Sequence, residues 1–269
     1  MAAVPVSPRL NRYDAVLLDL DGCLWVGDAA TPDAPAAVTA LREAGVRLVF
    51  LTNDGRHAVE RQVRKLWQLG FMASVDEVVT VGVAVEHLLA GREEPGSAFV
   101  VGSQALVDHV HASGMRIVNN TEWASRADVV VVGGHDDLHF RELRAATQAV
   151  LRGGELIGTS RDASFPMPDG PWPGTGAVLA AIETAAGRSA DRIVGKPEPE
   201  IYRTALDRLD GARRVLAIGD RRDTDVLGAH AAGLDAALVG PQAADDDPPG
   251  VRTPELRAAS LADLVLHAS

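Results

Sequence analysis

Short, uninterrupted apolar segments recur along the chain, and several are followed by a polar or acidic residue. Their length is typical of strands that are buried on both faces and is short for a helix. Stretches with apolar residues every three or four positions separate them and predict amphipathic helices, for example over 58–69 and 198–209. Alternating strands and helices indicate an α/β fold on a parallel sheet covered on both sides. The apolar segments in question are 15–18, 48–51, 215–218 and 236–239.

The middle of the chain repeats this alternation but lacks the polar motifs described below. It predicts strands over 98–101 and 129–132, and helices over 104–113, 138–152 and 177–186. We therefore predict two domains. Residues 1–87 and 189–269 form a catalytic core, and residues 88–188 form an α/β domain inserted into it.

Asp19 and Asp21 follow the first predicted strand directly. Strand alternation predicts that both carboxylates point the same way, with Leu20 opposite. Carboxylates at the carboxyl end of a parallel strand lie where open α/β sheets bind ligands, and two of them would repel each other without a cation. Mg²⁺ prefers carboxylate oxygen, so the pair predicts a magnesium site. The alternative is a solvated turn, because Asp-Gly sequences are common in turns.

Thr52 and Asn53 follow the second predicted strand. A hydroxyl, an amide and backbone N–H groups at a helix start can bind phosphoryl oxygens. When the pair is taken alone, a helix N-cap without any ligand is the favoured explanation. The pair therefore gains weight only together with the other motifs.

Two charged motifs complete the set. Lys196 is one of only two lysines in the chain and precedes Pro197, which we expect in the first turn of a helix. Asp220 and Asp225 follow a third buried segment and could complete an oxygen cage for magnesium, or simply cap a helix over 225–232. A nucleophile, a phosphate anchor, a counter-charge and a metal ligand thus all follow predicted strands.

With these motifs the chain resembles the haloacid dehalogenase-like (HAD) hydrolase superfamily. It is most similar to subfamily IIA, the branch with a large α/β cap that includes nitrophenylphosphatases and the phosphoglycolate and glycerol-phosphate phosphatases. The resemblance implies a Rossmann-like parallel sheet core with an inserted cap domain. It covers nearly the whole chain and is carried by the segments 19–25, 51–53, 195–199, 219–220 and 224–225, with the cap loop 162–176.

The resemblance implies a role for each matching residue. Asp19 is the nucleophile that forms an aspartyl-phosphate, and Asp21 protonates the leaving alcohol and then activates water. Lys196 neutralises the charge on Asp19 and the phosphoryl group, which Thr52 and Asn53 hold. The implied ligands of Mg²⁺ are Asp19, the backbone carbonyl of Asp21 and Asp220, and Asp225 supports the ion either directly or through water.

Specificity is expected to depend on residues outside this set. The resemblance implies that the loop 160–174 closes over the site and contacts the leaving group near Phe165, with Arg161 beside it. Asp54 and Gly55 stand where the family usually has another Asn and then a small polar residue, and Arg56 follows them. The extra carboxylate of Asp54 favours a polyol or a cationic leaving group.

The composition limits the classes of molecule that this protein is expected to bind. The formal net charge of −11 argues against nucleic acids and anionic membranes, which attract basic surfaces. The single cysteine, Cys23, and the absence of a leader or membrane-spanning pattern predict a cytoplasmic protein. The expected partner is a small-molecule phosphate ester, and a homodimer through the cap is a further expectation.

Three alternatives stay open at this point. A phosphotransferase or phosphomutase could use the same fold, provided that water is kept from the intermediate. A receiver-like phospho-switch also uses an acidic cluster, a Thr and a Lys, but it needs less than half of this chain and has no use for Asp21. A catalytically silent binding protein would not need Asp19, Asp21, Lys196 and Asp220 together.

Overall fold

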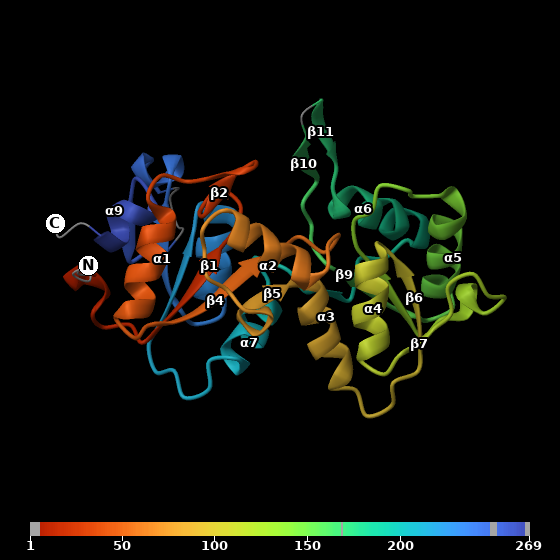
Figure 1. Ribbon diagram of the computed structural model, residues 1–269. Coiled ribbons are helices and arrows are strands. Elements are labelled where there is room, and N and C mark those ends of the chain that lie inside the picture. The colour runs from red at the N-terminus through yellow and green to blue at the C-terminus, as the bar shows by residue number, and fades with distance from the viewer. Residues whose placement is uncertain (1–5, 168, 248–251, 267–269) are drawn as a thin grey trace. The chain divides into compact units, whose positions relative to one another are not determined.

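The computed structural model describes residues 6–167, 169–247 and 252–266 (Figure 1). The chain forms two compact units. Unit 1 contains the described residues of Met1–Thr52, Val59–Val79 and Lys196–Ser269, and unit 2 those of Asn53–Ala58 and Thr80–Gly195. The roles of catalytic core and cap, and the bounds 1–87, 88–188 and 189–269, stay predictions.

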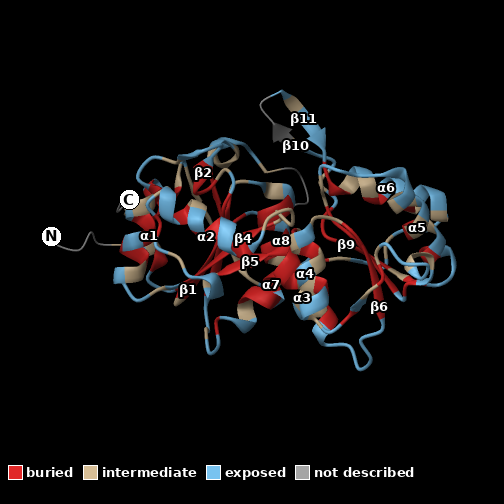
Figure 2. Cartoon of the chain, turned by 45° about the vertical axis from the view of Figure 1, so that its right-hand side comes forward, coloured by how far each residue is buried: buried red, intermediate tan, exposed pale blue. Residues whose placement is uncertain are grey.

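The first sheet carries the predicted strands of the outer segments. Its order is β15-β14-β13-β1-β4-β5, and the ladders that join β1 to β4 and to β13 are parallel. Every residue of β1 is buried, as a strand covered on both faces requires (Figure 2). The strands are β1 (Ala15–Asp19), β4 (Arg47–Thr52), β5 (Val78–Thr80), β13 (Val215–Gly219), β14 (Asp235–Val239) and β15 (Leu256–Ala258).

Helices and a small hairpin flank this sheet. The predicted apolar face of α2 is buried through Val59, Val63 and Leu66. The α-helices are α1 (Ala34–Glu43), α2 (Val59–Gln68), α7 (Pro199–Asp207), α8 (Leu227–Ala231) and α9 (Leu261–Leu266). Short helical turns are η1 (Pro8–Leu10), η2 (Val75–Glu77), η4 (Arg222–Val226) and η5 (Pro241–Ala244), and the hairpin consists of β2 (Trp25–Val26) and β3 (Ala29–Ala30).

Unit 2 is built on a second parallel sheet of order β12-β9-β8-β6-β7. Val129–Val132 is buried throughout and packs with α5 and α6 in one apolar core. The strands of this sheet are β6 (Ser97–Val101), β7 (Arg116–Ile117), β8 (Val129–Val132), β9 (Glu155–Gly158) and β12 (Arg192–Ile193). The helices are α3 (Val81–Ala90), α4 (Gln104–Ala112), η3 (Ala124–Arg126), α5 (Phe140–Leu151) and α6 (Thr175–Ala186).

A separate antiparallel hairpin, β10 (Ser164–Met167) and β11 (Gly170–Pro173), extends from unit 2 (Figure 1). It occupies the segment 160–174, which we expected to be a loop. The ladder that pairs Phe165 with Trp172 explains the ordered backbone. How this hairpin lies relative to unit 1 stays a prediction.

The predicted α/β class is confirmed, and two local expectations are wrong. Helix α7 begins at Pro199 rather than Pro197, because Glu198 is the extended N-cap residue. The helix expected over 225–232 is preceded by a π-helical turn, η4, and becomes α-helical only at Leu227. Within the described residues no helix has the length and apolar character to cross a bilayer.

Candidate active site

Three carboxylates meet at the carboxyl edge of the first sheet. Asp19 is the last residue of β1, Asp220 follows β13, and Asp225 lies in η4. Each can offer one oxygen such that all three oxygens lie within 4.8 Å of one another. Parallel neighbouring strands end at the same edge, so the register of β1 and β13 brings these distant residues together.

Two glycines make room for these carboxylates. A Cβ on Gly22 would overlap the Asp220 carboxylate, and a Cβ on Gly219 would overlap the Asp225 side chain. Gly22 also has φ +85°, which disfavours any residue with a side chain. The close approach of backbone to carboxylate therefore depends on glycine at both positions.

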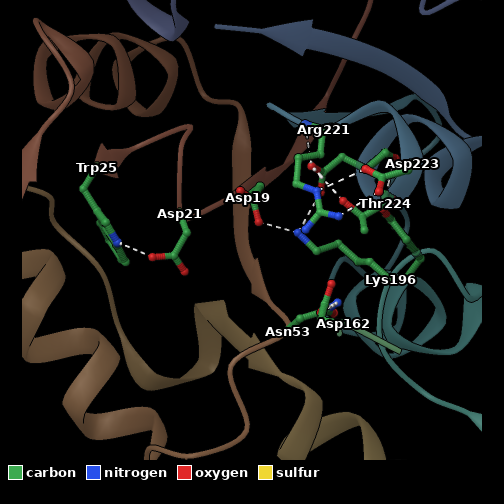
Figure 3. A network of polar contacts seen from close by, with 11 residues as sticks. Asp19, Asp21, Trp25, Asn53, Asp162, Lys196, Arg221, Asp223 and Thr224 are labelled. Carbon is green, nitrogen blue, oxygen red and sulfur yellow. Dashed lines mark hydrogen bonds and ion pairs between the residues drawn. The ribbon is translucent and has the colours of Figure 1, made fainter. Parts of the chain in front are cut away.

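Lys196 joins two of the carboxylates (Figure 3). Its ammonium group donates to Asp19 and to Asp225, the latter at 2.7 Å. The side chain is only 5% exposed. Burial works to lower the pKa of Lys196, but the charges of Asp19 and Asp225 outweigh it and hold that pKa well above its usual value. Lys196 is therefore a permanent buried cation.

One ammonium does not balance three carboxylates. Burial, together with the neighbouring Asp225 and Asp220, raises the pKa of Asp19 despite the attraction of Lys196. Burial and Asp225 raise the pKa of Asp220 to about 6. Fully ionised, the four groups carry two excess negative charges. A divalent cation with oxygen ligands would neutralise that excess, so the donor set fits Mg²⁺ in both charge and chemistry.

Asp225 accepts two further hydrogen bonds that the sequence did not predict. Its second carboxylate oxygen accepts from the backbone N–H of Arg221 at 3.0 Å, and its backbone carbonyl accepts from the Tyr202 hydroxyl at 3.1 Å. Tyr202 is buried on α7, and the sequence analysis did not single it out. Asp225 therefore supports Lys196 as well as offering an oxygen to a cation.

Among the described residues, the Asp21 carboxylate does not belong to this cluster of three, and the expected magnesium site shared with Asp19 stays a prediction. Strand β1 ends at Asp19, so strand alternation no longer applies two residues later. The Asp21 carboxylate instead accepts from the indole N–H of Trp25 at 2.8 Å (Figure 3). Its backbone carbonyl stays the predicted metal ligand.

Thr52 ends β4 next to this edge and is buried. The register pairs Asp19 with Leu51, so Thr52 follows directly after the residue opposite the predicted nucleophile. Asn53, the next residue, belongs to unit 2, where its amide donates to Asp162 at 3.2 Å. Thr52 and Asn53 are thus covalent neighbours in different units.

Asp54 is engaged by its own neighbours. Its carboxylate accepts from the backbone N–H and Nε of Arg56, and His57 Nδ1 lies 2.7 Å from it. Burial works to raise the pKa of Asp54, but the hydrogen bonds from His57 and Arg56 hold it below its usual value. Arg56 and His57 thus surround this carboxylate, and its expected effect on the choice of leaving group stays a prediction. Sequence reasoning missed His57, for which only the adjacency to Asp54 was a signal.

Within unit 2, Arg56 stacks on the hairpin. Its guanidinium carbon lies 4.0 Å from the centre of the Phe165 ring, and Phe165 in turn contacts Trp172. Arg161 lies before the hairpin and pairs with Glu183 of α6 at 2.9 Å. The structure therefore brings Asp54, Arg56 and Phe165 together and directs the Arg161 guanidinium to Glu183.

The balance of charge around Lys196 gives a stability prediction. We expect Lys196→Met to destabilise the metal-free protein by about 3 kcal/mol at neutral pH, since it leaves buried carboxylates without their cation. A carboxyl group whose pKa is higher in the folded than in the unfolded protein stabilises the folded state when it is protonated. The deficit should therefore be small near pH 4 and grow as the pH rises towards and past about 6.

Urea unfolding in the presence of a chelator, followed at several pH values, measures this deficit. Lys65→Met is the matched control because Lys65 is the only other lysine of the sequence and lies 4.5 Å from the centre of the Trp25 ring. It should cost about 1 kcal/mol or less at every pH. A loss of stability for Lys196→Met that does not change with pH would contradict the charge argument.

Comparisons with known proteins agree with this geometry. A family model described as haloacid dehalogenase-like hydrolase matches residues 16–116, and one described as HAD-hydrolase-like matches residues 193–264. D-glycerol 3-phosphate phosphatase of Mycobacterium tuberculosis is 36% identical over 230 residues, which cover 85% of this chain and 63% of that protein. The match thus spans less than two thirds of that relative.

Two further similarities extend over more of the compared chains. Chronophin of Homo sapiens is 35% identical over 245 residues, which cover 86% of this chain and 82% of that protein. A solved structure of glycerol phosphate phosphatase from Mycobacterium tuberculosis in complex with magnesium matches with a TM-score of 0.87 at 33% identity. That match covers 96% of this chain and 78% of the solved one.

Proposed function

The chain belongs to the haloacid dehalogenase-like hydrolase family, and on that premise we propose that it is a magnesium-dependent phosphatase of small-molecule phosphate monoesters. The observation that carries this proposal is the buried cluster of Asp19, Asp220 and Asp225 with Lys196. A nucleophile beside a permanent cation and a metal-ligand set is what phosphoryl transfer to an aspartate requires.

Asp19, Asp220 and Asp225, with the backbone carbonyl of Asp21, would hold the Mg²⁺. When bound, the ion supplies positive charge that offsets the charge of the phosphoryl oxygens. Its presence would also keep Asp19 ionised, against the burial that raises the pKa of that carboxyl. Lys196 contributes a second, fixed positive charge beside the same carboxylate.

The reaction then proceeds in two balanced steps. The Asp19 carboxylate attacks phosphorus, and the bond from phosphorus to the ester oxygen breaks as Asp21 gives that oxygen its proton. Asp21 next accepts a proton from a water molecule, which attacks the aspartyl-phosphate and releases phosphate from Asp19. Thr52 and Asn53 are proposed to donate hydrogen bonds to the phosphoryl oxygens in both steps.

Release of inorganic phosphate tests this function. Purified protein with Mg²⁺ should release phosphate from several members of a panel that includes nitrophenyl phosphate, glycerol phosphate and phosphoglycolate. Alcohol release with phosphate appearing on an added sugar would indicate a phosphotransferase instead. Stable phosphorylation of the protein without turnover would indicate a phospho-switch.

We propose that Asp54, Arg56, Arg161 and Phe165 select the substrate. Arg56 follows Thr52 by four residues, so the chain alone keeps their Cα atoms within about 14 Å of each other. Within the described chain the Arg56 side chain donates only through Nε, to Asp54. The guanidinium carbon lies over the Phe165 ring, and the two terminal nitrogens can donate to an oxygen of the substrate's alcohol portion.

This arrangement gives a specificity prediction. We expect Arg56→Gln to lower kcat/KM about tenfold for phosphoglycolate, whose carboxylate is a strong acceptor, and much less for nitrophenyl phosphate. Phe165→Ala removes the ring under the Arg56 guanidinium. It should also lower kcat/KM more for phosphoglycolate than for nitrophenyl phosphate. Steady-state assays of both esters measure the effect.

Two further variants sharpen that test. Arg161→Ala should have a smaller effect, since its guanidinium is already paired with Glu183. Phe140→Ala is the matched control, because Phe140 is an exposed phenylalanine at the start of α5. An unchanged substrate ranking in both Arg56→Gln and Phe165→Ala would exclude this pair as the selector.

Location and assembly complete the proposal. We propose that the protein acts in the cytoplasm, without nucleic acid or membrane partners, which the acidic net charge of −11 supports. A homodimer through unit 2 is supported by the exposed aromatic side chain of Trp123. Sedimentation of the purified chain would test it.

A further inference from the structure

The proposed proton donor, Asp21, is held by a side chain to which the mechanism gives no role. One oxygen of its carboxylate, Oδ1, accepts from Trp25 Nε1 at 2.8 Å (Figure 3). Among the described residues this is the only hydrogen bond recorded to that carboxylate. Asp21 is otherwise exposed, whereas Trp25 is only 1% exposed. A buried donor thus holds an exposed acid.

The backbone fixes Trp25 relative to Asp21. Gly22 N–H donates to the Trp25 carbonyl at 2.7 Å, and Trp25 N–H donates to the Leu20 carbonyl at 3.3 Å. Gly22 permits this tight turn through its φ of +85°. Since both partners lie in one short hydrogen-bonded turn, the indole reaches Asp21 without depending on distant parts of the chain.

The other lysine of the chain, Lys65, contacts the ring of the same indole. Lys65 Nζ, from α2, is 4.5 Å from the centre of the Trp25 ring. A cation on the ring face restrains the ring plane and draws electron density from it, which makes the N–H a stronger donor. Lys196 thus contacts the proposed nucleophile Asp19, and Lys65 contacts the indole that holds Asp21.

We propose that Trp25 is a positioning residue for Asp21, supported by Lys65, and that it directs the proton of Asp21 to the leaving oxygen. This inference rests on the proposed phosphatase function. The indole bond to Oδ1 leaves Oδ2 to carry the proton. As the ester bond breaks, that proton passes from Oδ2 to the departing oxygen, and the indole N–H stabilises the carboxylate left behind.

If Trp25 positions Asp21, the effect of replacing it on kcat/KM should depend on the leaving group of the ester. A purely structural role of Trp25 would affect all esters equally. Glycerol leaves as an alcohol and needs the proton, whereas nitrophenolate is a stable anion and does not. kcat/KM reports the steps up to release of the alcohol, so it is independent of the later hydrolysis of the intermediate. We expect Trp25→Phe to lower kcat/KM about tenfold for glycerol phosphate and by less than about twofold for nitrophenyl phosphate.

A double-mutant cycle shows whether Trp25 acts through Asp21. In an Asp21→Asn background, Trp25→Phe should cause no further loss with glycerol phosphate. Trp67→Phe is the matched control, because the Trp67 indole donates to the Ala73 carbonyl in the same unit, away from Asp21. It should leave both kcat/KM values unchanged.

Lys65→Met leaves the Trp25 indole in place, so this variant tests the same inference if Trp25→Phe does not fold. It should shift the ratio of the two kcat/KM values in the same direction, by about twofold. Equal losses for the two esters, or full additivity with Asp21→Asn, would overturn the inference while leaving the phosphatase function intact. A wild-type protein that hydrolyses neither ester would instead overturn the proposed function itself.

Discussion

The Asp19→Asn variant is expected to lose turnover of every phosphate ester by about four orders of magnitude or more. An amide is nearly the same size as a carboxylate but cannot attack phosphorus to form the acyl phosphate. The choice of ester should not matter, because the nucleophile is common to all of them. Steady-state hydrolysis of nitrophenyl phosphate with excess Mg²⁺ gives the most sensitive measurement.

The fold should survive this substitution. Burial disfavours the charged form of Asp19, so a neutral amide relieves repulsion from Asp220 and Asp225. We therefore expect the metal-free variant to resist urea at least as well as the wild type. Asp210→Asn, at an exposed position after α7, is the control that makes the same chemical change without affecting turnover. Wild-type turnover in Asp19→Asn would refute the proposed nucleophile.

Removal of Mg²⁺ is the second change with a large expected effect. A chelator should reduce turnover to the background rate, and excess Mg²⁺ should restore it. The reason is the two excess negative charges of the buried cluster, which would otherwise repel the phosphoryl group. Titrating Mg²⁺ into chelated protein while recording both turnover and thermal stability measures the two consequences of binding.

Asp220→Asn identifies the site of that Mg²⁺ effect. Loss of one carboxylate ligand should raise the Mg²⁺ concentration needed for half-maximal turnover by at least about tenfold. Asp223→Asn is a close control, since Asp223 lies in the same loop but is exposed and pairs with Arg221. Equal shifts in the two variants would show that loop charge, and not ligation by Asp220, governs the response to Mg²⁺.

The positions of Asp19, Asp220 and Asp225 could be predicted from local patterns. Each follows a short apolar segment, and such segments mark strands whatever the rest of the chain does. Parallel order then places the ends of β1 and β13 at one edge. Lys196 could be predicted for a different reason, because the family resemblance, and not its spacing, distinguished it from a surface lysine.

The surroundings of Asp21 and Asp54 could not be predicted in this way. Asp21 departs from strand alternation because the chain leaves the sheet at Asp19 and turns back to Trp25. Asp54 looked like a free charge facing the substrate, yet Arg56 and His57 satisfy its carboxylate. Both outcomes depend on side-chain geometry in irregular segments, which no periodic pattern encodes.

The sequence by itself determined the α/β class, the sheet edge at which the carboxylate cluster lies and the residue types gathered there. The sequence determines these features because each buried strand is marked by its own apolar residues, and the alternation of strands with helices implies a parallel sheet. Only the tertiary structure decided which partner each charge has: Lys196 between Asp19 and Asp225, Trp25 on Asp21, and Arg56 on Phe165. A hydrogen bond or a stacked pair requires positions correct to a fraction of an ångström between residues that are brought together only by the folded backbone.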